Sequence, residues 1–119
     1  MLKLSIDGVH LGVNSDLEKY VNKKLGKLDR FIPKPMRDSA HAEVFLKESS
    51  VKDKKQCTCA VVMHLPKEEY VTKETTINIF AAVDIVEAKL KNQLNKYKAM
   101  HEEKRRIFIL GRHYLRKSL

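Results

Sequence analysis

Apolar and polar residues alternate in four segments of the chain, a pattern that predicts half-buried β-strands. The alternation is clear in residues 2–6, 39–47 and 56–65, whereas residues 68–76 are more polar and rich in Tyr, Val and Thr. The intervening residues 48–55 read ESSVKDKK, which predicts a polar and flexible connection between the second and third strands.

Two other segments place apolar residues every three to four positions, which predicts amphipathic helices. The first helix is expected over residues 15–32, with a capping box at Ser15-x-x-Glu18 and an end at Pro33. Asn78 is the predicted N-cap of a second, long helix that reaches residue 106. Its apolar stripe consists of Phe80, Val83, Val86, Leu90, Leu94 and Tyr97.

The resulting order is β-α-β-β-β-α, which predicts an α+β two-layer sandwich with two helices on one face of a largely antiparallel four-stranded sheet. The first strand is expected to lie beside one of the other three. We expect one domain over residues 1–104 and a basic tail over 105–119. Residues 107–110 are compatible with a helical extension, a short strand or an apolar contact with a partner, and Gly111 is a possible stop.

Positive charge is concentrated at the C-terminal end of the chain. The formal net charge is +9, and residues 89–119 hold six Lys and four Arg against only Glu102 and Glu103. This asymmetry predicts an anionic partner. We expect a nucleic acid and not a membrane, because the apolar stripe of the second helix is needed to cover the sheet.

The basic residues at helical spacing are the candidates for phosphate contacts. Lys23 and Lys27 lie on the first helix, and two rows seven residues apart follow the second helix, one with Lys89 and Lys96 and the other with Lys91 and Lys98. The second row continues to Arg105. The tail arginines could extend along RNA; they are Arg105, Arg106, Arg112 and Arg116.

Catalytic and metal-binding motifs are weak by comparison. His41 and Glu43 share a strand face and could act as a base and its orienting group, so a small enzyme stays an alternative. Cys57 and Cys59 lack the spacing of structural zinc sites, and His64 has the opposite strand parity. We expect no catalytic residue, no metal, no cofactor and no small-molecule substrate.

The location and the mode of RNA binding follow from the same residues. The N-terminus alternates and is no signal peptide, no apolar run is long enough to span a membrane, and the two Cys fit a reducing interior, so a cytoplasmic location is expected. We also expect the protein to be a monomer. Only Phe45 and Tyr70 are candidates for base stacking on an exposed sheet. Recognition through shape and phosphates is therefore favoured, and a general double-stranded-RNA-binding module is an alternative.

Three segments together resemble the family of ribosome hibernation-promoting factors and ribosome-associated inhibitors. They read LEKYVNKKLGKLDRF, IFAAVD and AKLKNQLNKYK, and the family shows YVxKKLxKLxxF, DMYAAID and KLxRQLxKxK in the same order. The resemblance covers residues 2–98. It implies a β-α-β-β-β-α domain that binds the small ribosomal subunit and blocks the mRNA and tRNA channel in starvation or stationary phase.

The same resemblance implies rRNA contacts by particular residues of this chain. Lys23 and Lys27 match basic positions of the first motif, and Lys89, Lys96 and Lys98 match those of the last. Two positions depart from the family: Asn92 stands where Arg is usual, and Asn78 where Asp is usual. The chain resembles the short type of the family, without the C-terminal domain by which long members pair ribosomes.

Overall fold

The computed structural model describes the backbone of residues 2–9 and 11–118 and the side chains of residues 2–9 and 11–101. The element order confirms the predicted one, with two short 3₁₀ segments added after the first helix. The elements are β1 (Lys3–Val9), α1 (Ser15–Gly26), η1 (Lys27–Phe31), η2 (Lys34–Met36), β2 (His41–Val51), β3 (Lys54–Leu65), β4 (Glu68–Thr76) and α2 (Ile79–Ser118).

The four strands form one mixed sheet in the order β1-β2-β3-β4. β2, β3 and β4 make the predicted antiparallel meander, and Val44 of β2 lies opposite Val61 of β3. β1 pairs in parallel with β2, with Lys3 opposite His41. The sequence predicted that β1 joins the sheet but not its neighbour, because strand pairing is a non-local property.

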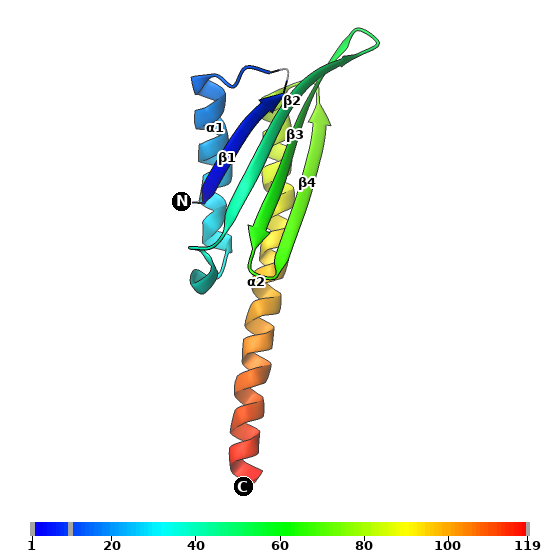
Figure 1. Ribbon diagram of the computed structural model, residues 1–119. Coiled ribbons are helices and arrows are strands. Elements are labelled where there is room, and N and C mark those ends of the chain that lie inside the picture. The colour runs from blue at the N-terminus through cyan, green and yellow to red at the C-terminus, as the bar shows by residue number, and fades with distance from the viewer. Residues whose placement is uncertain (1, 10, 119) are drawn as a thin grey trace.

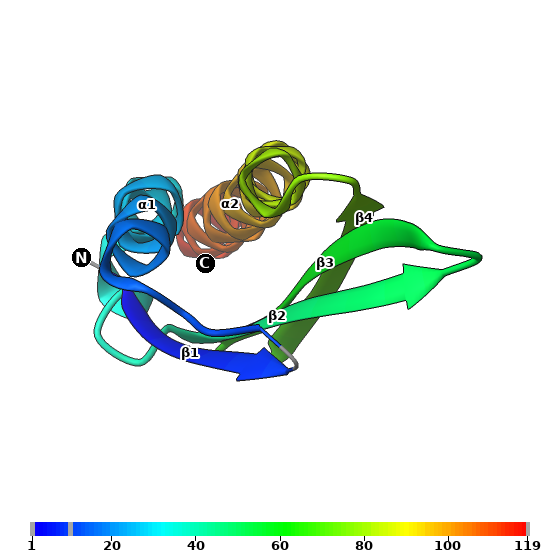
Figure 2. The same ribbon diagram turned by 90° about the horizontal axis from the view of Figure 1, so that it is seen from above.

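Both helices pack on one face of the sheet, as Figures 1 and 2 show. α1 lies over β1 and β2, and α2 lies over β3 and β4. The core forms where the inward side of the strands meets the apolar stripes of the helices, and Val44, Val61, Leu25 and Leu90 are each 1% exposed or less. Burying such a side chain contributes about 1.5–3 kcal/mol, so these two periodic patterns account for the two-layer sandwich.

The segment predicted as a flexible connection is instead a continuation of the sheet. β2 and β3 stay paired as far as Val51 and Lys54, and only Lys52 and Asp53 form the turn. These two residues have φ angles of 53° and 63°, as a two-residue type I′ hairpin requires. The usual sequence signal for this turn is Asn-Gly, and its absence explains why the prediction of a loose connection was wrong.

The ends of the helices differ in part from the predictions. Asn14, not Ser15, caps α1, because its side chain accepts a hydrogen bond from the backbone N–H of Leu17 at 2.8 Å. The α-helical part of α1 ends at Gly26, and the chain tightens into η1 before Pro33. The cap of α2 is confirmed, since the Asn78 amide oxygen accepts from the Phe80 N–H at 2.8 Å.

α2 continues well past the sheet, which makes the molecule 72 Å long (Figure 1). Of the three alternatives for residues 107–110, the helical extension is the observed one, and Gly111 does not end the helix. The division into a domain and a tail at residue 104 stays a prediction, since the described backbone runs through it as one helix.

Candidate nucleic-acid interface

The two helices are joined along their facing sides by Tyr20 of α1. Its hydroxyl donates a hydrogen bond to the Asp84 carboxylate of α2 at 2.5 Å, and its ring meets that of Phe80 edge to face at 5.0 Å. The bond to Asp84 raises the pKa of Tyr20 to about 12, so the phenol stays protonated at neutral pH. These contacts set how α1 and α2 face each other.

Near Tyr20 the charges of the facing segments are balanced. Lys24 Nζ lies 3.7 Å from Asp84 and 3.9 Å from Glu87, and Lys27 Nζ lies 4.0 Å from Glu87. Lys27, one of the predicted contacts, is therefore partly neutralised. Lys23 points to solvent on α1, and no ion pair to it is found among the described residues.

Further along α2, the side that faces η1 carries positive charges. Lys91 Nζ lies 5.3 Å from the centre of the Phe31 ring, and the Arg30 guanidinium lies 5.0 Å from it. Cation–π contacts of this kind hold the charged groups without neutralising them. This arrangement brings η1 and α2 together and places their positive charges on one side of the molecule.

Lys98 extends this cationic side by two turns of α2. With Lys34, Arg37 and His101 it lines a pocket of about 280 Å³, whose remaining wall is formed by residues 32–35. Arg37 is held in place because its Nε donates to the Ile32 carbonyl at 2.9 Å and its Nη2 to the Arg30 carbonyl at 3.3 Å. Sequence reasoning missed Lys34 and Arg37, because they lie in the segment of Pro33 and Pro35 and have no helical spacing.

Lys89 and Lys96 lie on the other side of α2. Lys89 forms an ion pair with Glu74 of β4, and this hydrogen bond lowers the pKa of the Glu74 carboxyl. Lys96 is exposed, and its seven-residue spacing puts it on the same side as Lys89. The predicted basic residues thus divide between the two flanks of α2, as their spacing indicated. Arg105 and Arg106 lie outside the residues whose side chains the structure describes.

The residues of the enzyme alternative do not pair as that alternative requires. Glu43 Oε2 lies 3.7 Å from Nε2 of His64 on the neighbouring strand, and the ring of His41 stacks on that of His64 at 4.6 Å. Cys57 and Cys59 are buried against the helices, on the opposite side of β3 from His64, and burial raises the pKa of Cys59 to about 12. Such a thiol is inert as a nucleophile at neutral pH.

The two candidate stacking aromatics lie on opposite faces of the sheet. Phe45 is 36% exposed on the open face, whereas Tyr70 packs edge to face against Tyr97 of α2, with ring centres 6.3 Å apart. Of these two residues, Phe45 alone lies on the open face, where a base could stack on it. Within the described residues, no helix is long and apolar enough to cross a membrane, and no cluster of three or more His, Cys, Asp or Glu side chains is arranged to hold a metal ion.

Comparison with known proteins agrees with this architecture. Residues 4–102 match the family described as sigma 54 modulation protein / S30EA ribosomal protein, so the chain belongs to this family. Its members are binding proteins and not enzymes. The chain is 26% identical over 106 residues to the ribosome hibernation promotion factors of Lactococcus lactis and Staphylococcus aureus.

These alignments cover 89% of the chain but 55% and 53% of the two relatives, so the chain spans about half their length. Among solved structures, the N-terminal domain of Protein Y from Thermus thermophilus superposes with a TM-score of 0.65 at 25% identity, covering 80% of this chain and 94% of that one. A ribosomal subunit interface protein from Coxiella burnetii has the same fold, with a TM-score of 0.65 at 21% identity and coverage of 82% and 99%.

Proposed function

We propose that this protein is a ribosome hibernation factor that binds the small ribosomal subunit and acts by occlusion. In this proposal its cationic side contacts rRNA phosphates, and its body blocks the channel for mRNA and tRNA in starvation or stationary phase. The names of the curated relatives support a role in ribosome hibernation. A ribosomal partner implies that the protein works in the cytoplasm, and we propose that it is a monomer off the ribosome.

One observation carries the proposal: cations from separate segments converge on the flank of α2 that faces η1 and η2. Lys91 and Lys98 come from α2, and Arg30, Lys34 and Arg37 come from the segment that packs beside it. Each phosphate contact contributes about −0.7 to −0.9 to the slope of log affinity against log salt, so five contacts give a slope of about −4. A polyanion such as rRNA can make that many contacts at once.

The residues that the sequence predicted remain proposed contacts, in addition to Arg30, Lys34 and Arg37. The predicted ones are Lys23, Lys27, Lys89, Lys91, Lys96, Lys98, Arg105 and Arg106. Lys27 and Lys89 rank lower, because each already has a carboxylate partner within 4.0 Å. Exposed ion pairs are worth about 0–1 kcal/mol, so a phosphate could still replace these partners.

The experiment is co-sedimentation of the protein with separated small and large ribosomal subunits over a series of salt concentrations. Lys91→Glu with Lys98→Glu should weaken binding to the small subunit at least about tenfold and lower the salt slope by about 1.4, since each lost contact removes about 0.7. The matched control is Lys47→Glu with Lys73→Glu. It makes the same charge change at two exposed positions on the open face of the sheet, and it should bind as the unchanged protein does.

Two results would contradict the proposal. Equal losses in the two double variants would mean that net charge alone drives binding. Equal binding to both subunits and to a plain RNA duplex would favour a general double-stranded-RNA-binding module. Circular dichroism of each variant separates a loss of binding from a loss of fold.

A further inference from the structure

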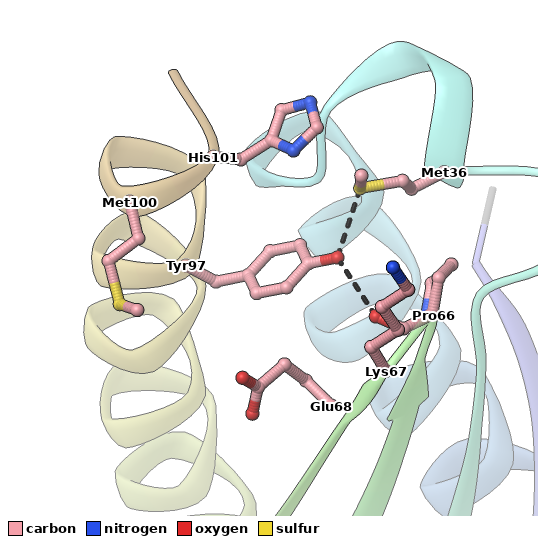
Figure 3. A pocket seen from close by; sticks show the side chains of 7 residues that line it. All are labelled: Met36, Pro66, Lys67, Glu68, Tyr97, Met100 and His101. Carbon is pink, nitrogen blue, oxygen red and sulfur yellow. Dashed lines mark hydrogen bonds between the residues drawn. The ribbon is translucent and has the colours of Figure 1, made fainter. Parts of the chain in front are cut away.

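A second pocket lies beside the cationic one, at the end of the sheet where α2 leaves the domain (Figure 3). Its volume is about 280 Å³, at the small end of the range for ligand sites. The lining residues come from three elements and from the turn between β3 and β4. They are Met36, Pro66, Lys67, Glu68, Tyr97, Met100 and His101.

The interior of this pocket is apolar and its back wall is fixed. The Tyr97 hydroxyl lies 3.0 Å from the sulfur of Met36 and 3.3 Å from the Pro66 carbonyl, to which its proton can be donated. Tyr97 is 7% exposed, while Met100 is 49% exposed and can adapt to a bound group. Thioethers make favourable contacts with aromatic rings, so this lining suits a flat aromatic group.

The charged groups lie at the rim. Figure 3 shows the Glu68 carboxylate on one side of the Tyr97 ring and His101 on the other. His101 also lines the cationic pocket with Lys34, Arg37 and Lys98. One imidazole therefore separates an apolar pocket from a cationic pocket of equal volume. Such a pair matches the two parts of a nucleotide, whose planar base is joined through its sugar to a phosphate.

We propose that the two pockets bind one unstacked guanine nucleotide, with its base beside Tyr97 and Met100 and its phosphate at Lys98 and Arg37. Guanine is favoured because Glu68 is an acceptor-only group when ionised, and the N1–H and N2–H of guanine are adjacent donors that match its two oxygens. Adenine and cytosine offer one amino group on the same edge, and uracil offers only its N3–H, which lies between two carbonyl oxygens that repel a carboxylate. The expected order is therefore guanine first and uracil last.

The nucleotide could be free, or it could be a flipped-out residue of an RNA chain. The second source rests on the proposed ribosomal function, while binding of a free nucleotide does not. Sequence-specific proteins commonly read RNA through unstacked bases held against aromatic or apolar side chains. In that case the contacts of the pocket with the base would make binding sequence-specific, since the phosphate contacts of the cationic side carry no sequence information.

The test uses methyl NMR of the protein labelled at its methionines. Titration with GMP should shift the Met36 and Met100 signals saturably, while the signal of Met63, which is fully buried in the core, should stay in place. UMP should bind at least about tenfold more weakly, because a charge-assisted hydrogen bond to Glu68 is lost. No shift at Met36 and Met100 up to about 10 mM, tenfold above a millimolar Kd, would overturn the proposal.

Variants separate the two parts of the site. Lys98→Glu should weaken GMP binding about tenfold or more through charge repulsion, and Lys73→Glu, the same change at an exposed position on the open face of the sheet, should leave it unaltered. Glu68→Ala should remove the preference for GMP over UMP. If Lys73→Glu weakens binding as much as Lys98→Glu, the phosphate is not in the pocket and the proposal is wrong.

Two RNA ligands identify the source of the nucleotide. A short single strand with one guanine should shift the same methyl signals if the site accepts a nucleotide within a chain, and a duplex in which that guanine is paired should not. Shifts with GMP but not with the single strand would assign the site to a free nucleotide. If the unchanged protein does not bind ribosomes but GMP still shifts its methionine signals, only the ribosomal role is refuted. The two proposals can therefore be tested independently.

Discussion

The hydroxyl of Tyr20 joins two helices whose contacting residues are 64 positions apart in the sequence. The bond to Asp84 and the ring contact with Phe80 set how α1 and α2 face each other. Since Asp84 also lies near Lys24, one carboxylate serves a hydrogen bond and an ion pair. The way the two helices face each other thus depends on a residue that the sequence alone does not single out.

Removal of this hydroxyl tests its contribution. Tyr20→Phe keeps the ring contact and loses the hydrogen bond, which should lower the free energy of unfolding by about 1 kcal/mol near neutral pH. Because folding raises the pKa of Tyr20 from 10.0 to about 12, its contribution is complete below pH 10 and is lost as the pH rises towards 12. Urea unfolding at several pH values should therefore show the two proteins converging in that window. A gap that stays constant up to pH 12 would contradict this assignment.

At the scale of elements, the β2–β3 hairpin projects beyond the rest of the sheet (Figure 1). β1 pairs with β2 only as far as Lys47, and β4 pairs with β3 only from Cys57 onwards. Residues 48–56 therefore form a two-stranded arm whose stability depends on its turn. That turn places Lys52 and Asp53 in the left-handed region, which costs a non-glycine residue about 1–3 kcal/mol.

A better turn sequence should stabilise this arm. Lys52→Asn with Asp53→Gly gives the Asn-Gly pair preferred in type I′ turns and should slow amide hydrogen exchange in residues 48–56 about fivefold, equivalent to about 1 kcal/mol. Asp53→Ala keeps a Cβ in the left-handed region without the local hydrogen bonding of Asp and should speed exchange. Unchanged rates in both variants would mean that the turn does not limit opening of the arm.

At the scale of the whole molecule, the described buried core and the basic C-terminal residues lie in different parts of the chain. The buried side chains that the structure describes lie between Leu2 and Tyr97, while the last part of α2 carries five basic residues from Arg105 to Lys117. We expect that this extension can be deleted without loss of the described core. The division into a folded domain over residues 1–104 and a basic tail over 105–119 stays a prediction.

Shortening the chain to residues 1–104 tests this division. The midpoint of thermal unfolding should change by no more than about 4 °C, the shift that roughly 1 kcal/mol produces in a domain of this size. Co-sedimentation with ribosomes should become weaker and less salt-dependent, by about 0.7 in slope for each tail residue that contacts a phosphate. A large drop in the midpoint would show that the tail helix is part of the folding unit.

Prediction from the sequence succeeded where the signal is local. Alternation around Val44 and Val61 and the helical period through Leu90 and Leu94 identified the elements and their buried faces, because a residue's neighbours along the chain fix which way its side chain points. It failed at the Lys52–Asp53 turn and at the Asn14 cap. At the turn, the paired strands hold two non-glycine residues in the left-handed region against the usual preference. At the cap, Asn14 and Ser15 are both favoured residue types, so local preference alone did not decide between them.

The candidate site shows the same division. The sequence by itself determined that α2 carries two rows of lysines on either side of an apolar stripe, since a spacing of seven is two turns of a helix. Only the tertiary structure decided that Glu74 of β4 neutralises Lys89 and that Lys34 and Arg37 join Lys98. It also decided that Tyr97 and Met36 line one pocket. These pairings join residues 15 to 64 positions apart, and proximity at such separations arises only when the helices close on the sheet.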